Sequence, residues 1–267
     1  MPFDAVREAA PLGPGDVPAK PRFGKYLFRG FSRRSLAAFV VLISVAAGVG
    51  YHWSDLLDAN GTMDWLLAGL WLWLAVLVCW EVRPSQDVWL VLTGLAGGAV
   101  IETWGTQTGL WHYFTDERPP LWILPAWPVA ALAIDRQARW LSWLVPEAAL
   151  GARACRWAYW VLLGAFTLWM AGFMRPAWNH PGTWAVLVIM GAVVLHVGDP
   201  RTDVAVFLAG TLLGVFLEYW GTSRGCWTYY SAEVPPPVAI PAHGFAALAF
   251  CRVQRLVSLK FQTLACR

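Results

Sequence analysis

The stretch ETWGTQTGLWHY at residues 102–113 occurs a second time as EYWGTSRGCWTY at residues 218–229. The two stretches align without a gap at an offset of 116 residues, and seventeen of the 35 positions from 102 to 136 are identical to their partners. Self-similarity at a fixed offset indicates a tandem repeat. We therefore predict two copies of one unit, at residues 35–150 and 151–267, after a basic N-terminal tail at residues 1–34.

The composition is typical of an integral membrane protein. Of the 267 residues 58% are hydrophobic and only 14% are charged, whereas a soluble domain carries about a quarter charged residues. The charges gather in short patches between apolar stretches that are long enough to cross a bilayer, and the nineteen Trp residues fit membrane interfaces. We predict an all-α polytopic fold with about eight transmembrane helices, at residues 35–51, 64–80, 87–104, 122–134, 157–173, 183–197, 203–220 and 238–250.

These segments form two groups of four, so both copies are predicted to run through the membrane in the same direction. The fourth and eighth segments contain Pro125, Pro128 and Pro241, which predicts kinked or half-length helices. A basic, amphipathic stretch follows each of them, and we expect both stretches to lie in the inner membrane interface as anchors. These stretches are residues 136–144 and 252–264.

The distribution of Lys and Arg predicts the orientation. With the N-terminus inside, seventeen of the 20 basic residues lie inside, and only Arg118, Arg175 and Arg224 lie outside. The positive-inside rule then makes both termini cytoplasmic, and we expect a bacterial inner membrane. Residues 1–30 lack the early apolar core of a secretory signal, so the first transmembrane helix is predicted to be an uncleaved anchor. The net charge of +3 reflects this orientation, and no nucleic-acid partner is expected.

Each copy of the repeated stretch begins with a glutamate, Glu102 or Glu218, at the outer end of a Gly-rich segment. A carboxylate at membrane depth is costly and marks a functional site by default. A structural alternative stays open, in which each glutamate accepts hydrogen bonds from a nearby Trp or Tyr and locks a turn. Six aromatic residues keep their spacing in both copies, which an interfacial belt alone explains poorly: Trp104, Trp111, Tyr113, Trp220, Trp227 and Tyr229.

A carboxylic acid beside a wall of aromatic rings suits chemistry on an apolar polyene. Desolvation favours the protonated acid, which can protonate a carbon–carbon double bond, and aromatic faces stabilise the resulting cation by about 1–2 kcal/mol per contact. We therefore predict that Glu102 and Glu218 are catalytic, and that the six aromatic residues and His243 bind the substrate. No cofactor is expected. The five Cys and five His residues lack the spacing of a metal site.

The two copies differ in the residues near each glutamate. The first copy offers His112, Asp116 and Trp127, and the second offers Arg224 and His243 at or near the matching positions. A nearby Arg favours an ionised carboxylate. We therefore expect Glu102 to be the better proton donor and Glu218 to stay charged. We also expect the two stretches to face one another in one pseudo-symmetric body, because a glutamate turned to lipid is costly.

The pattern E-x-W-G-T-x-x-G-x-W-x-Y, followed by Pro-Ala at 125–126 or 241–242, resembles the membrane-integral carotenoid enzymes. It is similar to the small-domain lycopene cyclases, which also occur as tandem copies, to the membrane carotenoid hydratase family and to related uncharacterised bacterial membrane families. The chain carries Trp127-Pro128 and Gly244-Phe245 in the regions where the cyclases have a Glu-Glu pair. The resemblance implies that Glu102 and Glu218 are among the acidic residues of such an enzyme.

Two functions follow as expectations. The first is an enzyme that acts on an apolar isoprenoid or carotenoid-like lipid by proton-driven hydration, cyclisation or isomerisation. The second is a non-catalytic protein, either an assembly factor or scaffold for a pigment or respiratory complex, or a lipid carrier. The expected partners are correspondingly a membrane lipid or a membrane-protein complex.

Overall fold

The computed structural model describes residues 23–52, 65–144, 151–195 and 198–265, and these residues are mostly helical, as predicted. Two three-residue strands interrupt the helices. In chain order the elements are α1 (Phe23–Arg29), α2 (Arg33–His52), α3 (Trp65–Cys79), α4 (Pro84–Gln107), β1 (Trp111–Tyr113), α5 (Ala126–Leu144), α6 (Ala152–Phe173), the 3₁₀ helix η1 (Arg175–Ala177), α7 (Pro181–Val194), α8 (Pro200–Ser223), β2 (Trp227–Tyr229) and α9 (Ala239–Ala265).

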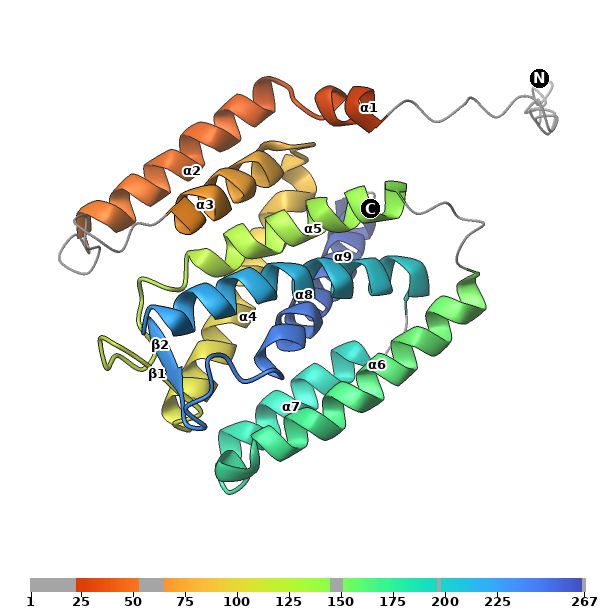
Figure 1. Cartoon of the computed structure of the whole chain (residues 1–267). Helices are drawn as coiled ribbons and strands as arrows, with labels where there is room; N and C mark the ends of the chain where they lie inside the picture. Colours follow the sequence, from red (N-terminus) through yellow and green to blue (C-terminus); the bar gives the residue numbers. More distant parts are fainter. Residues whose placement is uncertain (1–22, 53–64, 145–150, 196–197, 266–267) are drawn as a thin grey trace, which may run out of the picture.

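Four helices form the centre of the molecule. Helices α4, α5, α8 and α9 pack against one another, the pair α2 and α3 lies on one side of them, and the pair α6 and α7 lies on the opposite side (Figure 1). Among the residues whose burial the structure describes, helix α8 contributes the largest number of buried residues to this centre. The elements α8 and β2 repeat α4 and β1 at the same offset of 116 residues that the sequence shows.

Helices α8 and α9 approach closely because both carry glycine where they cross. A Cβ atom built on Gly210 would lie 2.8 Å from the Gly244 Cα, and one built on Gly244 would lie 2.6 Å from the Phe207 carbonyl oxygen. Between α4 and α5 the matching contact is looser, since a Cβ on Gly94 would lie 3.1 Å from the Ala131 Cβ. Small residues of this kind are common where membrane helices pack backbone to backbone.

Among the described residues, two helices are long and apolar enough to cross a membrane, namely α4 and α8. A third candidate is the pair α1 and α2, which is bent by 71° at its break. The segments Gly69–Cys79 and Pro181–Val194 are apolar but shorter. The structure therefore supports two or three spans by length and composition, and the eight predicted spans remain a prediction. Part of the sixth predicted span, at residues 196–197, and residue 64 of the second lie outside the described residues.

The fourth and eighth segments are not half-length helices. Helix α5 begins only at Ala126, after a turn at 121–125, and it continues without a break to Leu144. Helix α9 runs for 27 residues from Ala239. Each of these helices therefore includes the basic stretch that was expected to form a separate anchor in the membrane interface.

The first arginine of each basic stretch is buried in the protein, which also contradicts the expected anchor. Arg136 is 1% exposed and donates to Asp87 at 2.6 Å, and Arg252 is 6% exposed and donates to Asp203 at 2.8 Å. Both acids lie 49 residues before their arginine. A buried arginine requires a charged partner, and in each copy the partner stands in the first turn of the preceding long helix.

Candidate functional site

Each repeated stretch folds as the end of a helix followed by a sharp turn and a short strand. Helices α4 and α8 end two residues before Gly109 and Gly225, whose φ angles of +71° and +68° suit glycine. After the turn, the next Trp folds back over the helix. A Cβ atom on Gly105 would lie 1.8 Å from the Trp111 ring, so this glycine makes room for the indole. Gly221 does the same for Trp227, at 1.9 Å.

The folded-back indole brings its N–H group to the glutamate at the start of the stretch. Glu102 is 4% exposed, and its Oε2 accepts a hydrogen bond of 3.1 Å from Trp111. The Tyr113 hydroxyl lies 2.9 Å from both carboxylate oxygens, and the Trp127 N–H donates to Oε1 at 3.1 Å. An indole N–H can only donate. Glu102 is therefore held mainly as a hydrogen-bond acceptor.

Glu218 has the same surroundings with one chemical difference. It is 4% exposed and accepts from the Trp227 indole at 3.2 Å and from the Tyr229 hydroxyl at 2.9 Å. In the place of Trp127 it has His243, whose Nε2 lies 2.8 Å from Oε1. An imidazole nitrogen can donate or accept a proton. The protonation and tautomer of His243 therefore decide which group donates in this contact.

The expected difference between the two glutamates stays a prediction, and the structure adds a group that the expectation did not use. The prediction assigned the charged state to Glu218 because of Arg224, whereas the group that meets the Glu218 carboxylate and distinguishes it from Glu102 is His243. The His243 ring also stacks on Trp127, with centroids 6.1 Å apart and planes 16° apart. Trp127 and His243, which occupy matching positions and each contact one glutamate, therefore lie side by side.

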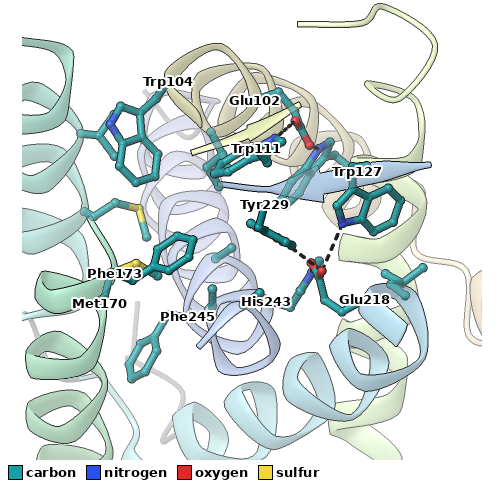
Figure 2. Close-up of a pocket in the computed structure, with 18 of the residues that line it drawn as sticks. Glu102, Trp104, Trp111, Trp127, Met170, Phe173, Glu218, Tyr229, His243 and Phe245 are labelled. Atoms are coloured by element: carbon teal, nitrogen blue, oxygen red, sulfur yellow. Dashed lines mark hydrogen bonds and ion pairs between the residues drawn. The ribbon is translucent and has the colours of Figure 1, made fainter. Parts of the chain in front are cut away.

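The two stretches meet through their strands. Strands β1 and β2 pair antiparallel, with Trp111 opposite Tyr229 and Tyr113 opposite Trp227. This pairing confirms that the stretches face one another, as predicted. It also places Tyr229 between the two glutamates, and Figure 2 shows its side chain pointing toward Glu218. His112 pairs with Thr228 at the centre of the same two strands.

Both glutamates line one cavity of about 250 Å³. Aromatic and aliphatic side chains form nearly all of its wall, and the polar groups come from the two glutamates and their hydrogen-bond partners. Helices α6 and α7 close the side opposite the glutamates, where Met170 and Phe173 are seen in Figure 2. The sequence prediction missed this side, which includes Phe166, Met170, Phe173, Met174, Val186, Leu187 and Met190.

Most of the predicted site residues lie together. Glu102, Glu218 and six of the seven predicted substrate-binding residues line the cavity, namely Trp104, Trp111, Tyr113, Trp227, Tyr229 and His243. Trp104 also donates from its indole to the Thr183 hydroxyl at 3.0 Å, which joins α4 to α7. The exception is Trp220, which does not line this cavity. The repeat-related Trp104 does line the cavity, so the two copies differ at this position.

The tyrosines of the two strands are held in their neutral form. Burial raises the pKa of Tyr113 and of Tyr229 well above the usual value, and the negative charge of Glu102 or Glu218 beside each hydroxyl adds to the shift. Each tyrosine is also influenced by the glutamate of the other copy. The four groups therefore form one electrostatic unit. Among the described residues, no group of three or more His, Cys, Asp or Glu residues is placed to hold a metal ion.

Comparison of the chain with protein-family models, with curated proteins and with solved structures gives no match. The resemblance to membrane-integral carotenoid enzymes rests on the repeated stretch alone. The function is therefore argued below from the geometry of the cavity.

Proposed function

We propose that the protein is an integral membrane enzyme that protonates an apolar isoprenoid or carotenoid-like lipid and completes a hydration, cyclisation or isomerisation. The observation that carries the proposal is the pair of buried carboxylates in one cavity that is otherwise apolar and aromatic. The Glu218–His243 pair can hold and deliver a proton. An apolar lipid is the substrate class that such a wall would bind.

The reaction begins with proton transfer from the Glu218–His243 pair to one carbon of a double bond. A C–H bond forms, the π bond breaks, and the neighbouring carbon becomes a cation. The faces of Trp111 and Tyr229, whose ring centroids are 6.2 Å apart, stabilise this charge, as does the Glu102 carboxylate. In an isomerisation or cyclisation, Glu102 accepts the proton that the cation loses. In a hydration, water attacks the cation and its proton returns to a carboxylate.

The same proposal includes the membrane arrangement. We propose that α2 to α9 are eight spans in two parallel groups of four, with both termini cytoplasmic in a bacterial inner membrane. Large apolar side chains on the outside of the bundle support this arrangement, since Leu168 is 79% exposed and Val188 is 70% exposed. An exposed apolar surface of this kind fits lipid better than water.

The test is turnover by variants of the two glutamates. Each protein would be produced in a bacterial host that makes lycopene, and the pigments would be separated by chromatography. We expect Glu218→Gln to abolish product formation and Glu102→Gln to lower it by about a hundredfold or more, the usual loss on removal of an acid or base. Glu117→Gln and Glu233→Gln are matched controls, because these repeat-related glutamates are exposed and do not line the cavity.

The alternative is a lipid carrier or a scaffold for a membrane complex, and one observation favours it. Each glutamate accepts hydrogen bonds from the Trp and Tyr of its own turn, which is the geometry of a structural lock. A carrier would bind the same lipid without using the acids. An absence of turnover in the wild-type protein, together with unchanged lipid binding by folded Glu102→Gln and Glu218→Gln, would leave this alternative in place of the enzyme.

A further inference from the structure

A second cavity, of about 350 Å³, lies between α4, α7 and α9. Its wall is made of aliphatic and aromatic side chains, and the hydroxyl of Thr93, which also lines it, donates to the Leu90 carbonyl at 3.1 Å. The cavity therefore offers a ligand almost no polar contact. Several of its residues lie on the outer surface of the bundle, where Leu92, Val100 and Ile189 are 50%, 45% and 56% exposed. This cavity is called the groove below.

The groove adjoins the cavity that holds the glutamates. Ile101, Val186 and Met190 line both, so these three side chains form the boundary between the two spaces. Helix α4 runs along both, from Trp89 in the groove to Glu102 in the cavity. With a rise of 1.5 Å per residue, these 13 residues span about 20 Å. A long, thin ligand could therefore extend from the carboxylates toward the N-terminal end of α4.

The residues that shape the groove differ between the two copies. Gly97 in α4 allows the Phe250 ring to approach, because a Cβ atom at this position would lie 2.1 Å from that ring. At the repeat-related positions the chain has Leu213 and Ile134, which are both buried in the core. Phe250 in turn packs edge-on against Trp127, with ring centroids 5.9 Å apart. The groove is thus lined by Gly97 and Phe250, a pair of residues that the other copy does not have at the matching positions.

We propose that the groove binds the unreactive apolar tail of the same lipid whose double bond reacts beside Glu102 and Glu218. This inference rests on the proposed function and specifies its substrate as a linear chain that is longer than the acid cavity. The reactive end lies among the indoles, and the tail passes Ile101 and Met190 and leaves between α4 and α7. Because the tail makes only apolar contacts, its length and shape decide the affinity.

The test measures the binding of three all-trans prenols of increasing length, geraniol, farnesol and geranylgeraniol, to the purified full-length protein in lipid nanodiscs. The affinity of the wild-type protein should rise at each step, since every added group enters the groove. Ala96→Trp should fill the groove and weaken geranylgeraniol binding by about tenfold or more, while geraniol binding changes by less than about twofold. Leu212→Trp is the matched control, because Leu212 is the repeat-related residue in α8, is 47% exposed and lies outside the groove.

The position of the tail would be mapped with geranylgeraniol that carries a diazirine at its last carbon. Photolabelling should fall on groove residues such as Val100 and Val253, and an excess of unlabelled geranylgeraniol should remove it. Labelling that spreads over all exposed helices and resists competition would identify ordinary bilayer lipid and overturn the proposal. An equal loss of affinity for all three prenols in Ala96→Trp, or in Leu212→Trp as well, would also overturn it.

These outcomes are separate from those of the proposed function. If Glu218→Gln loses turnover but Ala96→Trp keeps the wild-type dependence of affinity on prenol length, the tail site is disproved and the proposed enzyme stands. Groove labelling together with no turnover by the wild-type protein would support a tail site in a protein that carries lipid and does not transform it.

Discussion

At the scale of single residues, Trp127 and His243 give the two glutamates chemically different partners. Both side chains meet one oxygen of a buried glutamate, at 3.1 Å and 2.8 Å. The indole supplies a fixed donor, whereas the imidazole can exchange a proton with its carboxylate. If the two halves of the site were identical, neither glutamate would be favoured as the donor or as the acceptor of the proton. Under the proposed function, this single difference gives the cavity a side that releases a proton and a side that receives one.

Removal of the imidazole should therefore cost more than removal of the indole N–H. His243→Phe keeps a ring stacked on Trp127 and should lower turnover by at least about a hundredfold, the scale of general acid catalysis. Trp127→Phe keeps the aromatic ring but removes one hydrogen bond to Glu102, and the loss should be about tenfold or less. The measurement is the rate of product formation by each purified variant. Equal losses would contradict the unequal roles.

Alkaline pH should weaken the protein through Tyr113 and Tyr229. Burial and the adjacent glutamates raise the pKa of both tyrosines, so the folded protein keeps protons that the unfolded chain releases. Their contribution to stability is full below about pH 10, the unfolded pKa, and is lost as pH rises toward the folded value. We expect the melting temperature in detergent to fall above that pH. The fall should be smaller in the Tyr113→Phe, Tyr229→Phe double variant.

The double variant should also be less stable at neutral pH, by about 1–3 kcal/mol per buried hydrogen bond that is lost. The control is Trp111→Phe with Trp227→Phe, which removes hydrogen bonds to the same two carboxylates but no titrating group. It should be less stable at every pH and keep the alkaline fall. An alkaline fall of the same size in the tyrosine double variant would show that other groups cause it.

At the scale of elements, α4 and α8 have equal lengths but begin differently. Asp199 caps α8 and accepts from the backbone N–H groups of Arg201 and Thr202, whereas Arg83 at the start of α4 makes no side-chain cap. Loss of an Asp cap costs about 1 kcal/mol. Asp199→Ala should therefore lower the melting temperature more than Arg83→Ala, which removes only an ion pair with Glu81 at the surface.

The cap should also depend on acid pH. The hydrogen bond from the Thr202 hydroxyl, together with the backbone N–H groups, lowers the pKa of Asp199. Its stabilising effect is present above about pH 4, the unfolded value, and is lost as pH falls through the folded pKa. The difference in melting temperature between wild type and Asp199→Ala should shrink over that range. A difference that is constant down to strongly acid pH would mean that the charge of Asp199 has no part in it.

The sequence predicts the elements better than it predicts their contacts. The repeat brings out Glu102, Glu218 and their Trp and Tyr partners, because each Glu-to-Tyr stretch is local and its spacing is kept. It does not reveal that β1 pairs with β2, since three-residue strands have no detectable alternation and their paired residues are 114–118 positions apart. Nor does it separate Met170 and Phe173 from other apolar residues of α6. A side chain that faces a cavity and one that faces lipid are equally hydrophobic.

The two arginines show why the pattern of charges gave a wrong prediction of two interfacial helices. Arg136 and Arg252 stand in basic stretches rich in Trp or Leu, which are typical of interfacial helices. Their burial depends on Asp87 and Asp203, which are distant in the sequence. Both acids recur at the same offset as the arginines, so the repeat contained evidence for the two ion pairs. It was weak because a single aspartate at the start of a helix is also a common cap or dipole partner.

At the scale of the whole molecule, the basic residues predict the orientation in the membrane. Seventeen of the 20 Lys and Arg residues lie on the predicted inner side, so reporter fusions after Arg139 and after Arg267 should both be cytoplasmic. A fusion near Glu117, in the loop after β1, should be exported. Alkaline phosphatase and a fluorescent protein give opposite signals for the two sides. An exported reporter after Arg267 would mean that the cavity lies toward the opposite side of the membrane from the one predicted.

The pairing of β1 with β2 has a consequence for biosynthesis. When the ribosome has completed the first copy, Glu102 already has Trp111, Tyr113 and Trp127 within its own copy, but the strand that covers β1 does not yet exist. Tyr229 emerges 116 residues after Tyr113. During this interval an unpaired edge strand and a half-built cavity are open to the translocation machinery and to other newly made chains. Having both copies in one polypeptide ensures that the correct second strand is the next one to arrive.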